Sequence, residues 1–239
     1  QVFIDCDIDV ERFISCTFSL GVELFSNIQL KFGSTLINFG YEKTSLGLFK
    51  NLALVHSFTM PVGINHIVKD MSKVCLLTLE ESKKIISVFD FSFRDFSNIF
   101  GKDSFLKKIY FDSSNFRKIS KSLILNIIKS RIDEIFEMIK KQILTTSLNP
   151  TNSSGIFITG GGSNLNNLKD YSSTYFKTKV ENVQIEQKDK ENKQTDDFAA
   201  CFGALKIIKD GWETEAIPLR SKKFSEKTTF FDKIFRYRV

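Results

Sequence analysis

Cysteine, histidine and proline are scarce in this chain of 239 residues, which has 4, 2 and 3 of them respectively. The cysteines stand far apart and form no Cys-x-x-Cys pair: Cys6, Cys16, Cys75 and Cys201. With so few ligands we expect neither a zinc site nor a disulfide framework, and a reducing compartment suits the chain best. We interpret His56 and His66 as packing or surface residues, because the sequence offers no Ser/His/Asp or Cys/His catalytic set.

Long apolar runs are also missing. No run approaches the roughly 20 residues that a membrane-spanning helix needs, so we expect no segment to cross a bilayer. A hydrophobic content of 42% is nevertheless enough for a real core, in one large domain or two modest ones. The chain opens at Gln1 without a methionine or a signal sequence, so we expect that an N-terminal portion lies outside it.

The net charge of +6 is gathered at the C-terminal end. Residues 219–239 hold seven basic and two acidic residues, which leaves a charge of about +1 on the rest of the chain. A nearly neutral body argues against a broad nucleic-acid surface, so no nucleic-acid partner is predicted. The basic tail needs an explanation of its own.

Residues 34–60 have the pattern of a β-meander, with β-branched and aromatic residues between turn signals. Pro61 then favours a helix start, and the apolar spacing predicts a helix over 62–74. Thr78 followed by Leu-Glu-Glu predicts a second helix with a capping hydroxyl. Residues 89–116 are mixed, and we expect short strands and loops of a small insertion there.

Residues 119–144 have helical periodicity and predict a long helix with a broad apolar stripe: Leu123, Ile127, Ile128, Ile132, Ile135, Phe136, Ile139 and Ile143. From Gly155 the sequence predicts a short strand, a triple-glycine turn and a helix opening at Ser163. A strand over 176–180, a solvated loop over 187–197 and a helix over 197–211 capped by Gly211 complete the pattern.

The strand-TGGG-helix element at 156–168 has two interpretations. Glycines allow a backbone to come close to a ligand, and a helix N-terminus offers free N–H groups to an anion. The same residues also suit a tight structural turn between a strand and a helix. The surrounding elements bear on that choice.

The order of elements resembles the second large domain of the actin-like ATPases, and is most similar to the FtsA family of bacterial cell-division actin homologues. Five segments carry the resemblance, which extends over about residues 15–239: INFGYEKTSLGLF (37–49), MPVGINHIVKDM (60–71), SRIDEIFEMI (130–139), IFITGGGSNLNNL (156–168) and AACFGALKI (199–207). It implies an α/β fold, namely an actin-like (ribonuclease H-like) domain with a small inserted α+β subdomain and a C-terminal amphipathic helix.

The resemblance also implies a division of the chain. Residues 1–30 would end the preceding actin-like half, and 31–78 with 119–212 would form the large subdomain. Residues 79–118 would be the small inserted subdomain. A flexible linker over 213–228 would lead to an amphipathic membrane-targeting helix over 229–239.

By this resemblance the nucleotide site would be lined by Asn38, Gly40, Thr44, Gly63, Gly160, Gly161 and Gly162. The family's phosphate loop is typically Asp-x-Gly-Gly-Gly-Thr-Thr, and here Asn38 replaces the acid while Tyr41 and Glu42 replace two glycines. Such a loop brings no charge to Mg²⁺ and repels a triphosphate. We therefore expect no enzyme, or at most a weak ATPase, with ATP bound weakly or a retained empty pocket, and with Mg²⁺ left open.

The implied partners are the C-terminal peptide of FtsZ, an anionic membrane surface and further copies of the chain in actin-like filaments. The inserted subdomain would help to bind the peptide, with Arg131 and Glu134 near its groove. An arginine suits an acidic peptide. The other interpretation is that Arg131 and Glu134 are ordinary surface charges at helical spacing.

The tail predicts an interfacial helix. On a helical wheel one face collects the apolar residues Phe230, Phe231, Ile234 and Phe235. Lys233 and Arg236 face the other way, and Arg238 lies among the apolar positions, from which it can reach lipid headgroups. The alternative is a terminal helix that folds back onto the body.

Together these features predict a cell-division adaptor that tethers the FtsZ ring to the cytoplasmic face of the bacterial inner membrane at the division site. Two alternatives stay open. One is a PilM-type adaptor of pilus assembly, and the other is an actin-superfamily ATPase of chaperone or sugar-kinase type, which should have an intact acidic phosphate loop.

Overall fold

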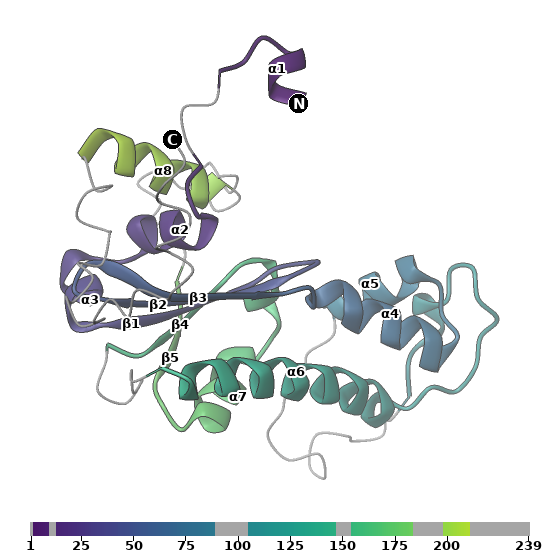
Figure 1. The fold of residues 1–239 in the computed structure, drawn as a ribbon. Coiled ribbons are helices and arrows are strands. Elements are labelled where there is room, and N and C mark those ends of the chain that lie inside the picture. Colours follow the sequence, from purple (N-terminus) through teal and green to yellow (C-terminus); the bar gives the residue numbers. More distant parts are fainter. Residues whose placement is uncertain (1, 10–12, 89–104, 147–153, 184–197, 211–239) are drawn as a thin grey trace, which may run out of the picture.

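A computed structural model describes residues 2–9, 13–88, 105–146, 154–183 and 198–210 (Figure 1). Its centre is a five-stranded sheet in the order β3-β2-β1-β4-β5. The strands are β1 (Ser34–Phe39), β2 (Thr44–Lys50), β3 (Ala53–Met60), β4 (Ile156–Thr159) and β5 (Val180–Asn182). The first three are antiparallel neighbours, as the meander predicts, whereas β4 is parallel to both β1 and β5.

Helices cover both faces of this sheet. In Figure 1, α2 and α8 lie above it, α6 and α7 lie below it, and α4 and α5 extend beyond one end. The helices are α1 (Val2–Asp5), α2 (Cys16–Leu24), α3 (Asn27–Phe32), α4 (Ile64–Cys75), α5 (Leu79–Val88), α6 (Lys121–Leu144), α7 (Leu168–Phe176) and α8 (Ala199–Asp210), with 3-10 turns η1 (Lys108–Tyr110) and η3 (Gly161–Asn164). Every described helix is too short or too polar to span a bilayer.

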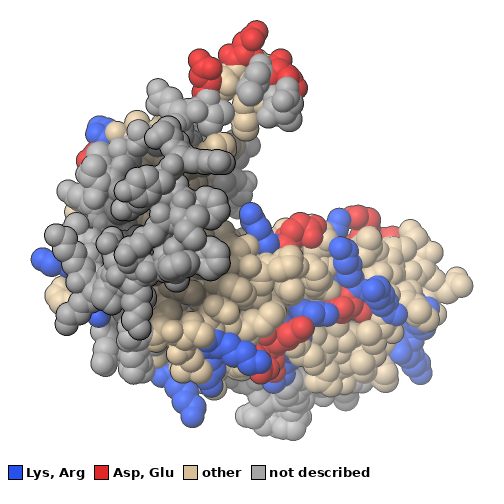
Figure 2. Space-filling view, viewed as in Figure 1, with Lys and Arg blue, Asp and Glu red and all other residues tan. Residues whose placement is uncertain are grey.

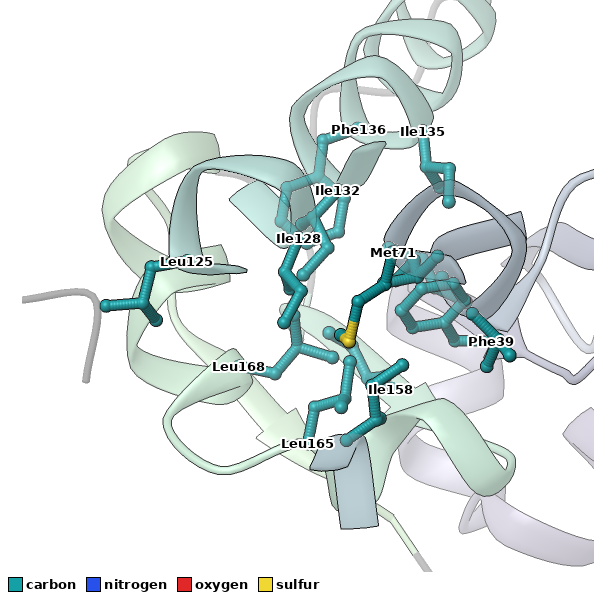
Figure 3. Packing of buried hydrophobic residues seen from close by; sticks show 14 of the residues in the cluster. Phe39, Met71, Leu125, Ile128, Ile132, Ile135, Phe136, Ile158, Leu165 and Leu168 are labelled. Atoms are coloured by element: carbon teal, nitrogen blue, oxygen red, sulfur yellow. The ribbon is translucent and has the colours of Figure 1, made fainter. Parts of the chain in front are cut away.

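Alternation along the strands divides the core into two layers. Ile156 and Ile158 of β4 belong to the lower cluster, and Phe157 between them belongs to the upper one. This is the period of two expected of a strand buried on both faces. Figure 3 shows Ile158 close to Leu165 and Leu168 in the lower layer.

The stripe predicted for the long helix is correct over most of its length. Ile128, Ile132, Phe136 and the other central members are buried on α6, and Figure 3 shows several of them directed into the lower layer. The first turn differs, because Leu123 is 40% exposed and Ile124 is buried in its place. The helix therefore presents a slightly different face at its N-terminal end.

The upper layer depends on close contact between α2 and α8. A Cβ on Gly203 of α8 would lie 1.8 Å from the Ser19 carbonyl oxygen of α2, so only glycine permits this approach. Phe18, Leu20 and Val22 of α2 are buried in the same cluster as Phe49 of β2. Helices α2 and α3, which belong to the segment expected to end a preceding half, thus pack on this sheet.

Two expectations about local structure near the triple-glycine turn are wrong. The helix does not open at Ser163, because Leu165 N bonds to Gly162 O in a 3-10 turn and α7 begins only after Asn167, whose φ of 63° is left-handed. The last strand covers Val180–Asn182 instead of 176–180, since α7 continues to Phe176.

Several expectations concern residues outside the described ranges. They are the centre of the small insertion (89–104), the loop 187–197, the cap at Gly211 and the tail.

Surface charges are interleaved on the face drawn in Figure 2, where blue and red residues alternate over the lower part of the body. The acidic residues at the top of that view belong to the projecting segment around α1, which carries Asp5, Asp7 and Asp9. On this face the described basic and acidic residues are therefore mixed.

Glu81 is a buried carboxylate that joins α5 to the loop before α6. Its oxygens accept hydrogen bonds from the backbone N–H groups of Thr78, Ser113 and Ser114, each 2.8 Å long, and from the Ser114 hydroxyl. Burial alone would raise the pKa of Glu81, but the hydrogen bonds from Ser114, Thr78 and Ser113 outweigh it and hold the pKa far below the ordinary value. The predicted capping hydroxyl is confirmed, because Thr78 Oγ1 accepts a 3.2 Å hydrogen bond from Glu81 N, and the Glu81 carboxylate also anchors this loop.

Glu81→Gln should lower the free energy of unfolding by about 3 kcal/mol at pH 7, because the amide NH₂ would face donors that need acceptors. The folded-state pKa of Glu81 is depressed, so the ionised carboxylate stabilises the folded protein at neutral pH. That contribution to the free energy of unfolding is lost progressively as the pH falls below about 4.3. Urea denaturation of both proteins at pH 7 and pH 3 measures it. The exposed Glu80→Gln is the matched control and should cost less than about 0.5 kcal/mol. Equal losses at both positions would contradict the anchoring role.

Candidate functional site

The parallel pairing of β1 with β4 brings two turns together that are distant in the sequence. Asn38 at the end of β1 lies opposite Thr159 at the end of β4. The hairpin turn 40–43 and the glycine turn 160–162 therefore leave the sheet at the same edge. Asn38, Thr44 and Gly63, three of the predicted nucleotide-site residues, lie on adjoining segments, and the other four lie on these two turns: Gly40, Gly160, Gly161 and Gly162.

The three glycines of the second turn have different surroundings. A Cβ on Gly160, whose φ is 87°, would lie 2.4 Å from Asn38 Oδ1 and 2.7 Å from the Phe39 carbonyl oxygen. A Cβ on Gly162 would lie 2.5 Å from the Phe39 ring, whereas one on Gly161 meets nothing within 4 Å. Gly160 and Gly162 thus serve the close contact with β1, and Gly161 leaves open space for a ligand.

The hairpin turn is tied to the start of α4. Gly40 N donates to Lys43 O at 3.0 Å within the turn, and the Thr44 hydroxyl donates to Val62 O at 2.7 Å. The Glu42 carboxylate accepts a 2.7 Å hydrogen bond from the Asn65 amide. Gly40 and Thr44 are therefore structural members of this junction.

The first N–H groups of α4 are directed at this chain's own acceptors. Ile64 N donates to Gly40 O at 3.1 Å and Asn65 N donates to Tyr41 O at 2.8 Å. Gly63 N donates to His66 Nδ1 at 3.2 Å, and a Cβ on Gly63 would lie 2.5 Å from the Gly40 carbonyl oxygen. His66, which we expected to be a packing or surface residue, caps the helix.

A pocket of about 360 Å³ lies beside these turns, within the size range of ligand sites. One wall comes from the hairpin and α4, a second from α5, and the remainder from the glycine turn and the residues after it. The lining is Tyr41, Ile64, Val68, Lys83, Ile86, Ser87, Gly161, Asn164, Leu165 and Asn166. It combines aliphatic surface with a few polar groups, as small-molecule sites do.

Sequence reasoning missed the α5 wall. Lys83, Ile86 and Ser87 recur at three- and four-residue spacing on a short amphipathic helix, which does not by itself distinguish a pocket from solvent. Lys83 Nζ lies 2.9 Å from Glu80 Oε1, and this hydrogen bond, the charge of Glu80 and the nearby Tyr41 raise the pKa of Lys83. Lys83 is therefore a cation at the edge of the pocket.

The two ends of the site suit a nucleotide differently. The open backbone at Gly161 and the aliphatic wall of Ile64, Val68 and Leu165 fit a nucleoside. The phosphate end supplies an amide at Asn38 and a carboxylate that is already bonded at Glu42. The described residues contain no group of three or more His, Cys, Asp or Glu side chains arranged for a metal ion. The residues present fit the nucleoside and do not fit a Mg²⁺-triphosphate.

Arg131 and Glu134, the predicted partner-binding residues, lie together on α6. The Arg131 Nε and Nη2 atoms contact Asp70 Oδ2 of α4 at 2.7 Å, and Nη1 contacts Glu134 Oε2 at 2.5 Å. The guanidinium thus joins α4 to α6, and an acidic peptide would compete with two carboxylates for it. The predicted membrane-binding residues from Phe230 to Arg238 lie outside the described residues.

Gly160→Ala should lower the free energy of unfolding by more than about 2 kcal/mol, because it adds strain at positive φ and a clash with Asn38. Gly161→Ala next to it is the matched control and should stay within about 0.5 kcal/mol of the parent, since its Cβ enters open space. Urea unfolding of both variants checks the contrast. Equal costs would show that the turn does not have this geometry.

Curated relatives of the chain are cell-division proteins. It is 22% identical over 171 residues to FtsA of Agrobacterium fabrum and 20% identical over 177 residues to FtsA of Helicobacter pylori. These matches cover 68% and 74% of this chain but only 37% and 36% of the two relatives. The chain thus corresponds to little more than a third of their length. No protein-family model matches it.

Solved structures similar to this one are actin-like proteins. MreB 5 of Spiroplasma citri bound to AMPPNP has a TM-score of 0.64 at 18% identity, covering 87% of this chain and 62% of that protein. The PilM-PilN type IV pilus biogenesis complex gives 0.58 at 14% identity, covering 82% and 52%. At such identities these likenesses establish the fold. The chain thus has the actin fold and is similar in sequence to FtsA over two thirds or more of its length.

Proposed function

We propose that this chain is part of a cell-division adaptor that holds FtsZ polymers on the cytoplasmic face of the bacterial membrane at the division site. The observation that carries the proposal is its similarity to FtsA over two thirds or more of its length, in an actin-like fold. The fold alone would suit other actin homologues, so the sequence similarity decides among them. A cytoplasmic, membrane-peripheral location follows from this role.

The proposed adaptor binds a nucleotide without turning it over efficiently. Actin-like neighbours bound to AMPPNP and ADP favour a nucleotide in the corresponding pocket. Asn38 in place of an acid removes the charge that would hold Mg²⁺, and Glu42 would repel phosphates. A chaperone-type or sugar-kinase-type ATPase needs that acid, so it is the less well supported function.

The FtsZ peptide would bind to an exposed surface beyond the end of the sheet, which we call the lobe patch: Leu76, Leu79, Phe116 and Arg117. Its apolar members are 71%, 46% and 51% exposed. Arg117 donates hydrogen bonds to the carbonyl groups of Cys75 and Leu76, which places the segment of Phe116 beside the segment that carries Leu76 and Leu79. An apolar surface with a cation beside it suits a peptide that has apolar and acidic residues.

Self-association into filaments is part of the proposal, as the actin-like fold allows. The PilM-type alternative is supported by structural likeness alone, at 14% identity. The Phe-rich basic tail favours the division adaptor over it.

The tail supplies the membrane contact. Four large apolar side chains would each contribute roughly 1.5–3 kcal/mol on burial, less the cost of ordering the segment. Nearby basic residues would each add about 1 kcal/mol on anionic lipid. Attachment would therefore be weak and reversible for one copy and stronger for a polymer.

The chain should pellet with liposomes that contain anionic lipid, and a version ending at Lys227 should not. Raising the salt concentration should weaken binding, because it screens the contacts between basic residues and headgroups. Co-sedimentation over a salt series measures both effects, and liposomes of neutral lipid are the control. Equal pelleting of the two versions, or no pelleting of either, would make the tail a packed terminal helix.

A further inference from the structure

We infer that the pocket recognises the nucleoside and is insensitive to the number of phosphates and to Mg²⁺. The inference rests on the proposed nucleotide site and specifies how that site is regulated. Gly161 leaves one wall of the pocket open, whereas on the phosphate side the first N–H groups of α4 and the Glu42 carboxylate are already bonded within the chain.

A phosphate gains affinity from free N–H groups, from cations or from a bound metal. The N–H groups that open α4 are one set near the pocket, because Ile64 and Val68 of that helix line it. Those of Gly63, Ile64 and Asn65 donate to His66 Nδ1, Gly40 O and Tyr41 O respectively. None of the three is available without breaking the junction between α4 and the hairpin.

The charges near this junction do not replace those donors. Glu42 is fixed there by its hydrogen bond to Asn65, and Glu42 and the adjacent Lys43 together carry no net charge. Lys83 is paired with Glu80 at the pocket edge. A phosphate at this junction would therefore gain no donor from α4 and would face the Glu42 carboxylate, so it would remain in solvent.

The nucleoside end has the opposite character. Gly161 exposes backbone without a side chain, and the walls offer Tyr41 and aliphatic surface for a base. Since Lys83 and Ser87 of α5 form one wall and Asn164 follows the glycine turn, a bound nucleoside would bridge α5 to the sheet. Adenosine, ADP and ATP would therefore hold α5 against the sheet equally well.

The test is isothermal titration of the 239-residue chain with adenosine, AMP, ADP and ATP, each in Mg²⁺ and in EDTA. The four dissociation constants should agree within about threefold in either buffer. Mg²⁺-ATP binding that is more than about tenfold tighter than adenosine binding would overturn the inference and leave the nucleotide site intact. Failure of all four ligands to bind would overturn the site itself.

Two variants separate the ends of the pocket. Gly161→Val fills the open wall and should weaken all four ligands alike, by about tenfold or more. Glu42→Gln keeps an acceptor for Asn65 but removes the charge, so ATP should bind about threefold more tightly while adenosine stays unchanged. Loss of ATP binding alone in Gly161→Val, or no gain for ATP in Glu42→Gln, would contradict the assignment.

Discussion

Parallel pairing between β1 and β4 is the contact on which the rest of the molecule depends. It joins Thr35 to Ile156 and Asn38 to Thr159 across the long excursion through α4, α5 and α6. Such pairing has a cost in conformational entropy, because a long stretch of chain must close into a loop before the contact forms. α6 covers the lower face with an almost continuous aliphatic stripe, which is what the two buried faces of these strands require.

The same pairing explains why the site has two unequal ends. Close approach of the glycine turn to β1 uses Gly160 and Gly162 for packing and leaves Gly161 for a ligand. On the hairpin side, fixing α4 to Gly40 and Tyr41 consumes the donors that an anion would use. Stability of the junction and phosphate recognition thus compete for the same backbone groups. In the proposed function, this competition would account for a site that binds a nucleotide without turning it over.

Elements with strong local signals were predictable from the sequence, and long-range partners were not. The meander, the long helix and the Thr78 capping box follow from periodicity and capping chemistry. The helix start at Ser163 was wrong because the left-handed Asn167 and i to i+3 hydrogen bonds interrupt the helical pattern. The Asp70 partner of Arg131 and the α5 wall around Lys83 depend on how distant helices pack, which a single sequence does not encode in its spacing.

The central claim, a physical link between FtsZ and the membrane, is tested most directly by flotation of FtsZ with anionic liposomes and the chain. FtsZ should rise with the liposomes only when the chain is intact, and Leu76→Ser in the lobe patch should reduce this. Leu144→Ser is the control and should leave FtsZ flotation unchanged, because Leu144 is a similarly exposed leucine at the C-terminal end of α6, outside the lobe patch. FtsZ that lacks its C-terminal peptide should stay behind. If the chain floats and FtsZ does not, or if FtsZ rises with a chain ending at Lys227, the adaptor account is contradicted.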